Sequence, residues 1–316
     1  MRGIAVLALP AILVVACSSA PAPDSGSPVP TNVSTASPSP APSVHDITVG
    51  GERPVTVRVP PSYADDHPAP LLIVLHGYSS TGREDDDYLG LRALAADSGY
   101  LYASPDGTLD SDRNHFWNAT DACCDFGETG VDDVGYLRGV IDEIDRTLSV
   151  DLKRIGVVGH SNGAFMSYAL ACAHADRIAA LVSIAGATFA RAADCTPSEP
   201  VAVVQVHGTA DDNVDFDGGT VEGVGPRQMG PYPGAETTAE AWAKYDGCEP
   251  AAAQLDERID VDGDVPEAET TVSRWSGCRP GGAVELWTIP GGGHIPDLTG
   301  AFSAAVFDFL KAHPKP

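Results

Sequence analysis

Basic residues are scarce in this sequence. Its 316 residues include 19 Lys and Arg against 44 Asp and Glu, which gives a formal net charge of −25. A surface this negative repels phosphate backbones and anionic lipid headgroups, so we expect no nucleic-acid partner and no direct adsorption to a membrane. With 43% hydrophobic residues the composition is that of a globular protein. We expect it to be a monomer.

Long hydrophobic runs are also missing. The run from Ile4 to Val15 is shorter than the roughly 20 residues that span a bilayer, so it is typical of a signal-peptide core. It leads into Ala16-Cys17, which resembles a bacterial lipobox and predicts a signal peptide over residues 1–17 with lipidation of Cys17. An ordinary signal peptide cleaved near Ala20 is the alternative. We therefore expect a protein outside a bacterial cell membrane, either lipid-anchored or secreted.

Large apolar residues are nearly absent from residues 18–43, where Ser, Pro, Ala and Thr dominate. Such a segment cannot bury enough apolar surface to fold, so we expect an extended, disordered tether. The remaining residues, 44–316, are numerous enough for one domain with a substantial core.

Within residues 44–316, apolar runs alternate with helical patterns. An antiparallel hairpin is expected at 47–59, broken by Gly50-Gly51-Glu52. Predicted strands follow at 71–75, 100–103, 155–158, 180–184, 201–206 and 284–289, and predicted helices at about 89–96, 134–148, from 164, 237–245 and 302–310. This alternation indicates an α/β fold whose central sheet is mainly parallel and covered by helices on both faces.

Gly159-His160-Ser161-Asn162-Gly163 lies between the predicted strand 155–158 and the helix that follows. A Gly-x-Ser-x-Gly motif in this context is typical of a nucleophile elbow, a turn too tight for side chains at its flanking positions. The sequence therefore predicts Ser161 as a nucleophile. A serine in an ordinary Gly-rich turn is the alternative.

A serine hydroxyl needs a base to remove its proton and a carboxylate to orient that base. His294 follows three glycines after the strand 284–289, and Asp211 follows the strand 201–206. The chain order Ser, Asp, His is that of α/β-hydrolases. We expect Asp211 and His294 to complete a triad with Ser161, with Asp212 as the rival carboxylate.

Ester chemistry at Ser161 would also need donors for an oxyanion. The N–H of Asn162, at the start of the helix behind the nucleophile, is one expected donor. The N–H of Tyr78, in the loop after the strand 71–75, is the other. Alternatively His76-Gly77 only ends that strand.

Six segments occur together in this order: His76-Gly77, Trp117 to Cys124, Val131 to Gly135, Gly159 to Gly163, His207 to Asp211 and Gly291 to His294. From about His45 to the C-terminus the chain resembles the extracellular polyhydroxyalkanoate depolymerase and feruloyl esterase family, grouped with carbohydrate esterase family 1. The resemblance implies an α/β-hydrolase fold and ester hydrolysis through a Ser161 acyl-enzyme. It also favours Asp211 over Asp212. Ile295-Pro296 stands where such proteins often have Trp-Pro. Because this position lies beside the expected site, the difference weakens the assignment of the substrate.

Three residues are candidates for the substrate pocket: Trp117 and Phe116, from a long loop, and Ile295, beside the predicted base. Trp117 and Phe116 could instead pack that loop down. Asp132 and Asp133 precede a helical run and are expected to cap it.

Two acidic loops, at 211–217 and 260–264, lack the Glu at the twelfth position of a calcium loop. We expect both to be solvated, and we assign no metal and no cofactor.

Six cysteines remain after Cys17, and in an oxidising compartment disulfides are expected. Fifteen pairings are possible for six cysteines. We favour Cys248 with Cys278 first, then Cys172 with Cys195, and last the adjacent Cys123 and Cys124.

Together these observations predict a carboxylic-ester hydrolase whose partner is an ester substrate, either a polyester or an acylated saccharide. A cell-envelope acyltransferase and a non-catalytic binding lipoprotein are the alternatives, and a peptidase is a lesser one.

Overall fold

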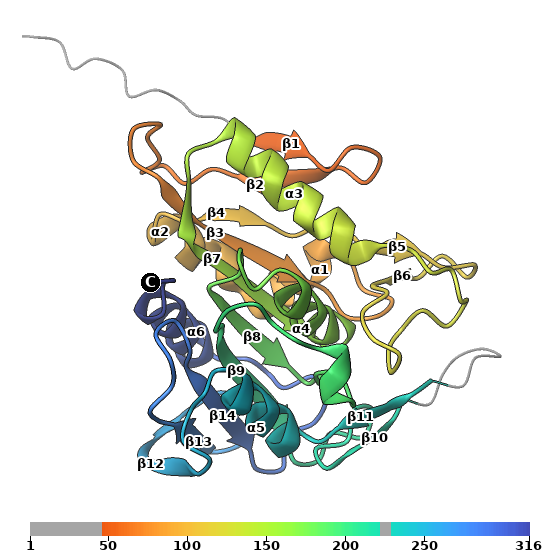
Figure 1. Cartoon of the computed structure of the whole chain (residues 1–316), viewed down its shortest axis with the longest axis vertical. Helices are drawn as coiled ribbons and strands as arrows, with labels where there is room; N and C mark the ends of the chain where they lie inside the picture. The colour runs from red at the N-terminus through yellow and green to blue at the C-terminus, as the bar shows by residue number, and fades with distance from the viewer. Residues whose placement is uncertain (1–45, 222–228) are drawn as a thin grey trace, which may run out of the picture. The chain divides into compact units, whose positions relative to one another are not determined.

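The computed structural model describes residues 46–221 and 229–316 (Figure 1). The expected signal peptide (1–17), its lipidation site Cys17 and the tether (18–43) lie outside the described residues. No helix of the described part is long and apolar enough to cross a membrane.

The described chain is built on a ten-stranded sheet with the order β1-β2-β4-β3-β7-β8-β9-β14-β13-β12. The six central strands are parallel and the strands at both edges are antiparallel. Their bounds are β1 (Ile47–Val49), β2 (Val55–Arg58), β3 (Ala69–Leu75), β4 (Leu101–Ala103), β7 (Val150–His160), β8 (Ala180–Ile184), β9 (Ala202–Gly208), β12 (Ala252–Ile259), β13 (Thr270–Trp275) and β14 (Val284–Ile289). The expected mainly parallel sheet with an N-terminal hairpin is confirmed.

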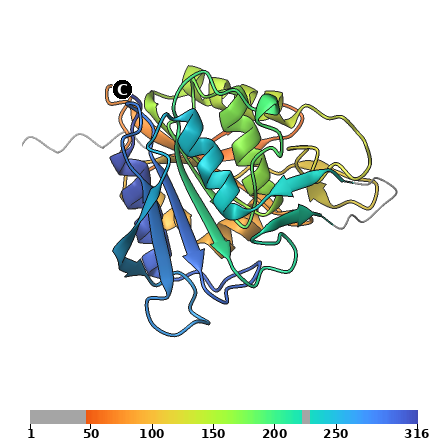
Figure 2. The same cartoon turned by 60° about the horizontal axis from the view of Figure 1, so that its bottom comes forward.

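Helices cover both faces of this sheet (Figures 1 and 2). One face packs against α3 (Asp133–Thr147), α4 (Asn162–Ala173) and α5 (Ala235–Tyr245). The other packs against α1 (Gly82–Leu89), α2 (Leu91–Asp97) and α6 (Gly300–Ala312). Because both faces are covered, the central strands are almost wholly buried, as their continuous apolar runs predict.

Several elements differ from the sequence prediction. Helix α1 was not expected, because Gly-Arg-Glu-Asp-Asp-Asp-Tyr-Leu shows little apolar periodicity. The edge strands β12 and β13 were also missed, since β12 is exposed along nearly all its length. The remaining described elements are a 3₁₀ helix, η1 (Ala192–Asp194), and two small antiparallel pairs: β5 (Thr108–Leu109) with β6 (His115–Phe116), and β10 (Gly218–Thr220) with β11 (Pro231–Pro233).

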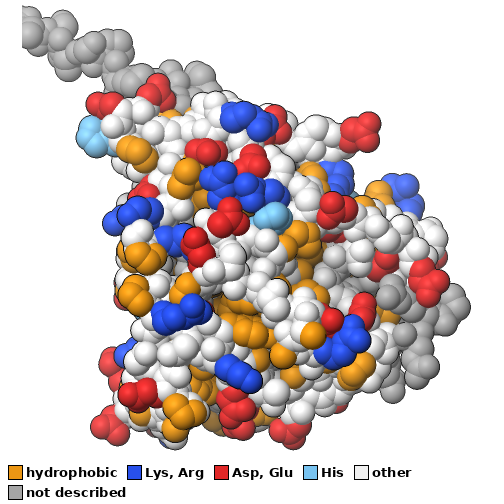
Figure 3. Space-filling model, viewed as in Figure 1, with side chains coloured by type: hydrophobic (Ala, Val, Ile, Leu, Met, Phe, Trp, Pro, Cys, Tyr) orange, Lys and Arg blue, Asp and Glu red, His pale blue; other side chains and the backbone are white. Residues whose placement is uncertain are grey.

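The expected disulfides are present: Cys248 with Cys278, Cys172 with Cys195, and Cys123 with Cys124. On the face shown in Figure 3, acidic and basic side chains are interspersed, so the excess negative charge forms no single large patch there.

Candidate active site

Ser161 lies at a sharp turn between β7 and α4. Its backbone has φ 52° and ψ −119°, a conformation that side-chain-bearing residues rarely adopt. A Cβ on Gly159 would lie 2.2 Å from the carbonyl oxygen of Gly163, and one on Gly163 would lie 2.1 Å from the carbonyl oxygen of Leu75. Only glycine fits at either position, so the motif has the geometry of a nucleophile elbow.

Three side chains from distant loops form a hydrogen-bonded chain at this turn. The Ser161 Oγ is 2.9 Å from His294 Nε2. On the other side of the ring, His294 Nδ1 lies 2.9 Å and 3.0 Å from the two carboxylate oxygens of Asp211. Since the carboxylate can only accept, Nδ1 carries a proton, and a neutral ring in this tautomer presents its Nε2 lone pair to the serine hydroxyl.

The carboxylate that contacts His294 is that of Asp211, not Asp212. Asp211 follows β9 and is 5% exposed. Its Oδ1 accepts hydrogen bonds of 2.9 Å from the N–H groups of Asn213 and Val214. Burial alone would raise the pKa of Asp211, but hydrogen bonds from His207 and His294 lower it well below the usual range. Asp211 is therefore ionised at neutral pH.

A buried polar network behind Asp211 was not expected from the sequence. The Tyr168 hydroxyl donates to Gln205 Oε1 at 2.7 Å, and Gln205 Nε2 contacts His207 Nδ1 at 3.0 Å. His207 Nε2 is 2.7 Å from the carbonyl oxygen of Val214 and 3.3 Å from Asp211. A polar Gln and His at alternate positions of the apolar strand β9 were the available signal, because such residues are buried only when hydrogen-bonded.

The loop after β3 lies directly against the elbow. A Cβ on Gly77 would lie 3.4 Å from the Cβ of Ser161, so the backbone here approaches the nucleophile closely. Within residues 46–221 and 229–316, the N–H groups of Tyr78 and Asn162 donate no hydrogen bond to another protein group. Both therefore remain open to an oxyanion, and their role there stays a prediction.

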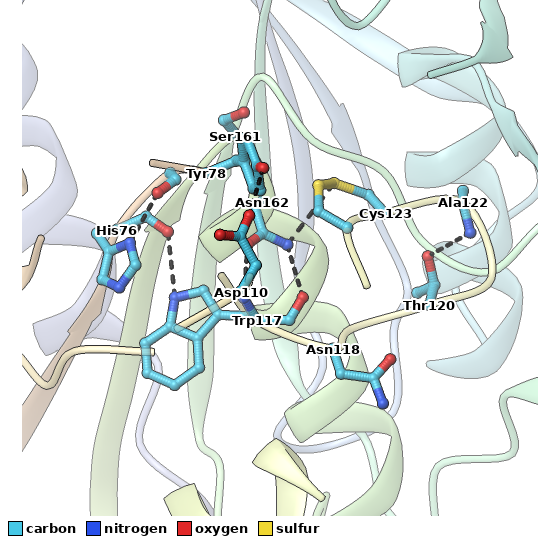
Figure 4. Close-up of a disulfide and its surroundings, with 12 residues drawn as sticks. His76, Tyr78, Asp110, Trp117, Asn118, Thr120, Ala122, Cys123, Ser161 and Asn162 are labelled. Atoms are coloured by element: carbon cyan, nitrogen blue, oxygen red, sulfur yellow. Dashed lines mark hydrogen bonds between the residues drawn. A yellow bond between two sulfur atoms is a disulfide. The ribbon is translucent and has the colours of Figure 1, made fainter. Parts of the chain in front are cut away.

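Trp117 and Phe116 are not part of the substrate pocket, which corrects the expectation for both. Trp117 is 0% and Phe116 is 1% exposed. The indole Nε1 of Trp117 donates to the carbonyl oxygen of His76 at 3.1 Å, and its backbone pairs with the side chain of Asn162 at 2.7 and 2.9 Å (Figure 4). These hydrogen bonds hold the loop against the buried side of the elbow, so Trp117 stabilises the site without lining the pocket.

Two cavities meet at Ser161, His294, Tyr78 and Ile295. The larger has a volume of about 560 Å³. Its apolar wall is formed by Tyr78, Phe126, Val214, Val221, Tyr232, Ile295 and the Cys123–Cys124 disulfide. Polar side chains line the rest of this cavity, among them Asn213, Asp215 and Thr220. The second, of about 440 Å³, is lined by Ser79, Ser80, Glu84 and Tyr88 among others. Ile295 is 67% exposed and lies at the junction, as expected for a pocket residue.

Tyr78 is held at this junction by its hydroxyl group. The hydroxyl donates to Asp110 Oδ2 at 2.7 Å. Burial and this hydrogen bond raise the pKa of Tyr78 to about 12. The phenol therefore stays protonated, and the hydrogen bond fixes its ring in the wall shared by the two cavities.

The remaining acidic candidates have structural roles. Asp132 caps α3 by accepting from the Gly135 N–H, as expected. Asp133 does not cap the helix; it is buried and pairs with Arg53 at 2.6 Å. Asp262, expected in a solvated loop, is 3% exposed and accepts from the Asp297 N–H beside the His294 loop. Among the described residues, no group of three or more His, Cys, Asp or Glu side chains is placed to hold a metal.

The doubly covered parallel sheet, with its elbow at the end of β7, defines an α/β-hydrolase fold. Residues 91–218 match the prolyl oligopeptidase family. Over 84% of this chain the fold superposes on acetyl xylan esterase from Aspergillus awamori, covering 98% of that chain with a TM-score of 0.57 and 15% identity.

Within that class, the expected similarity to feruloyl esterases is confirmed. The chain is 31% identical to feruloyl esterase B of Piromyces equi over 245 residues, which is 77% of this chain and 42% of that protein. It is 25% identical to feruloyl esterase D of Neurospora crassa over 258 residues, which is 78% of this chain and 75% of the relative. The chain thus spans less than half of the Piromyces protein.

Proposed function

We propose that this protein is a serine esterase that hydrolyses carboxylic esters through an acyl-enzyme on Ser161. The observation that carries the proposal is the chain of hydrogen bonds from Ser161 through His294 to Asp211, each of about 3 Å. A binding module would gain nothing from a buried carboxylate aligned on an imidazole that faces a strained serine.

In this mechanism His294 Nε2 removes the Ser161 proton as Oγ attacks the ester carbonyl. The new positive charge on the ring is stabilised by Asp211, and the N–H groups of Asn162 and Tyr78 hold the oxyanion. The C–O bond of the ester breaks and the alcohol leaves with the proton from His294. Water then repeats the sequence on the acyl-enzyme, which releases the acid and restores Ser161.

The larger cavity, which has the aromatic side chains of Phe126 and Tyr232 in its wall, suits an aromatic acyl group, and the second cavity would then take the alcohol. Aromatic acyl esters such as the feruloyl esters named for the relatives are one substrate class, and hydroxyalkanoate polyesters are another. The same acyl-enzyme could transfer its acyl group to an envelope hydroxyl. The match to the prolyl oligopeptidase family makes peptide amides a further class to assay.

The test compares wild type with Ser161→Ala on p-nitrophenyl acetate, methyl ferulate, polyhydroxybutyrate and a peptide p-nitroanilide. We expect ester turnover that falls to background in the variant. A fluorophosphonate should label one tryptic peptide, the one containing Ser161. Labelling elsewhere, or unchanged turnover by Ser161→Ala, would contradict the proposal, and glycerol added as acceptor separates transfer from hydrolysis.

We further propose that the enzyme acts outside the cell membrane, held by a lipid on Cys17 through the tether at 18–43. The support is the sequence pattern alone. Expression of the full chain in a bacterium with wild-type Cys17 or Cys17→Ser tests this. We expect the wild-type chain in the membrane fraction and the Cys17→Ser variant in the soluble fraction. An equal distribution of the two between these fractions would contradict the anchor.

A further inference from the structure

Asp85, on α1, contacts the loops that carry the proposed site. It is 4% exposed, although it lies in one of the most acidic stretches of the chain. Its Oδ2 accepts from the Gly77 N–H at 3.2 Å, and its Oδ1 accepts from the Ser80 hydroxyl at 2.5 Å. The carboxylate therefore binds both ends of the short loop that contains Tyr78.

The same carboxylate faces the elbow. His160 Nδ1 lies 3.7 Å from Asp85 Oδ2, within ion-pair distance. His160 Nε2 is 3.0 Å from the backbone carbonyl oxygen of His294. Because that carbonyl can only accept, Nε2 is the donor, so Nδ1 pairs with Asp85 only when the ring carries both protons. In either state the His160 ring lies between Asp85 and the His294 loop.

Asp85 is an anion in this position. Burial alone would raise its pKa, but contacts with His160 and Ser80 lower it below the usual range. A buried carboxylate is costly unless its oxygens are hydrogen-bonded, and here the compensating donors come from the loops that hold Tyr78 and Ser161.

We propose that Asp85 is a positioning residue that sets the register of three loops, so that the Tyr78 N–H, Ser161 and His294 converge on one substrate carbonyl. The inference rests on the proposed esterase function. The hydrogen bond to the Gly77 N–H fixes the peptide plane between His76 and Gly77. The following plane, between Gly77 and Tyr78, carries the Tyr78 N–H and then has less freedom to rotate. Through His160, the same carboxylate limits how far the His294 backbone can move from Ser161.

The principal test is Asp85→Asn. An amide has one acceptor oxygen and no charge. If that oxygen binds the Gly77 N–H, the Ser80 hydroxyl must turn to accept from the amide NH₂; if it binds Ser80, the Gly77 N–H loses its acceptor; in both cases the charge that faces His160 is gone. We expect kcat on p-nitrophenyl acetate to fall about 10- to 100-fold with little change in KM, because displaced donors weaken transition-state binding more than substrate binding. Affinity for a boronic acid, whose Ser161 adduct fills the oxyanion site, should fall by the same factor as kcat/KM.

Asp86→Asn is the matched control. Asp86 is the next residue on α1 and is 6% exposed, but its carboxylate binds the Tyr102 hydroxyl and Arg92, each at 2.7 Å, away from the site. We expect it to lose thermal stability with kcat and boronate affinity unchanged. Equal kinetic losses in the two variants, or wild-type kcat and boronate affinity in Asp85→Asn, would overturn the role of Asp85.

His160→Gln keeps the proposal testable if Asp85→Asn fails to fold. A glutamine amide can still donate to the His294 carbonyl, but it removes the ring nitrogen that faces Asp85. We expect kcat to fall about tenfold at constant KM, and a wild-type kcat would refute the link to the His294 loop. If wild type itself lacks Ser161-dependent turnover, the esterase proposal fails, which is distinct from loss of the Asp85 inference alone.

Discussion

Replacing Asp211 with Asn tests how the candidate base is oriented. The Oδ1 of Asp211 accepts from two backbone N–H groups, those of Asn213 and Val214. In Asp211→Asn the amide oxygen should remain there, because the amide nitrogen cannot accept a hydrogen bond. The NH₂ group would then occupy the position of Oδ2, which is 2.9 Å from His294 Nδ1. It would donate to Nδ1 and leave the ring proton on Nε2, facing Ser161, which is the wrong tautomer for a base.

The size of the effect follows from the charge that forms on His294. Two unit charges 2.9 Å apart attract by roughly 6 kcal/mol at an effective dielectric constant of about 20. The His294 side chain is 12% exposed, so solvent reduces this attraction somewhat. A loss of about 4 to 5 kcal/mol from the transition state lowers kcat by roughly 10³-fold or more.

The assay is steady-state hydrolysis of p-nitrophenyl acetate, with circular dichroism melting to show that each variant is folded. Asp212→Asn is the control, because Asp212 is adjacent but makes no hydrogen bond or ion pair with His294 among the described residues, and we expect its kcat to stay within about threefold of wild type. A folded Asp211→Asn that keeps more than a tenth of the wild-type kcat would refute the orientation argument. So would an equal loss in Asp212→Asn.

Four further predictions concern stability and the pocket. Hydrogen bonds lower the pKa of Asp211 despite its burial, so its carboxylate stabilises the fold above about pH 4, the pKa of an unfolded Asp, and this contribution is lost as the pH falls further. The difference in melting temperature between wild type and Asp211→Asn should therefore narrow from pH 7 to pH 3. Burial raises the pKa of Asp246 to about 7, so wild type should lose up to about 4 kcal/mol of unfolding free energy between about pH 4 and pH 8. Urea titrations should show a smaller loss for Asp246→Asn. Trp117→Phe removes a buried hydrogen bond to His76 and should cost about 1–3 kcal/mol with KM unchanged, whereas Ile295→Ala should change KM and leave the melting temperature nearly constant.

The parts of the site that were predictable from the sequence lie at the carboxyl ends of strands. Ser161, Asp211 and His294 each follow a short apolar run closely, and parallel strands bring such ends to one edge of the sheet. The class of fold was predictable for the same reason, since buried strands are continuous apolar runs. Both inferences use signals confined to a few neighbouring residues.

Most of the pocket wall was not predictable from the sequence, because it depends on the conformations of long loops. Trp117 was expected at the mouth of the pocket from its position in such a loop. Instead, the side chain of Asn162 binds both backbone groups of Trp117 and draws it beneath the elbow. Phe126, from a loop, and Tyr232, from the short strand β11, form part of the wall. Helix α1 was missed because its acidic residues suppress the apolar periodicity, although Asp85 is buried against the site.

In the buried network behind Asp211, the donor and the acceptor of each hydrogen bond can be assigned from the chemistry of the groups involved. Gln205 Nε2 donates to the carbonyl of Gly186 at 2.7 Å, and this carbonyl can only accept, so the amide orientation is fixed. The same nitrogen faces His207 Nδ1, which must therefore accept, and the His207 proton lies on Nε2. From there it points to the carbonyl of Val214 and to Asp211. A buried glutamine two positions earlier on β9 thus determines which nitrogen of His207 carries the proton that faces the carboxylate, so part of the lowering of the Asp211 pKa comes through a residue that never touches His294.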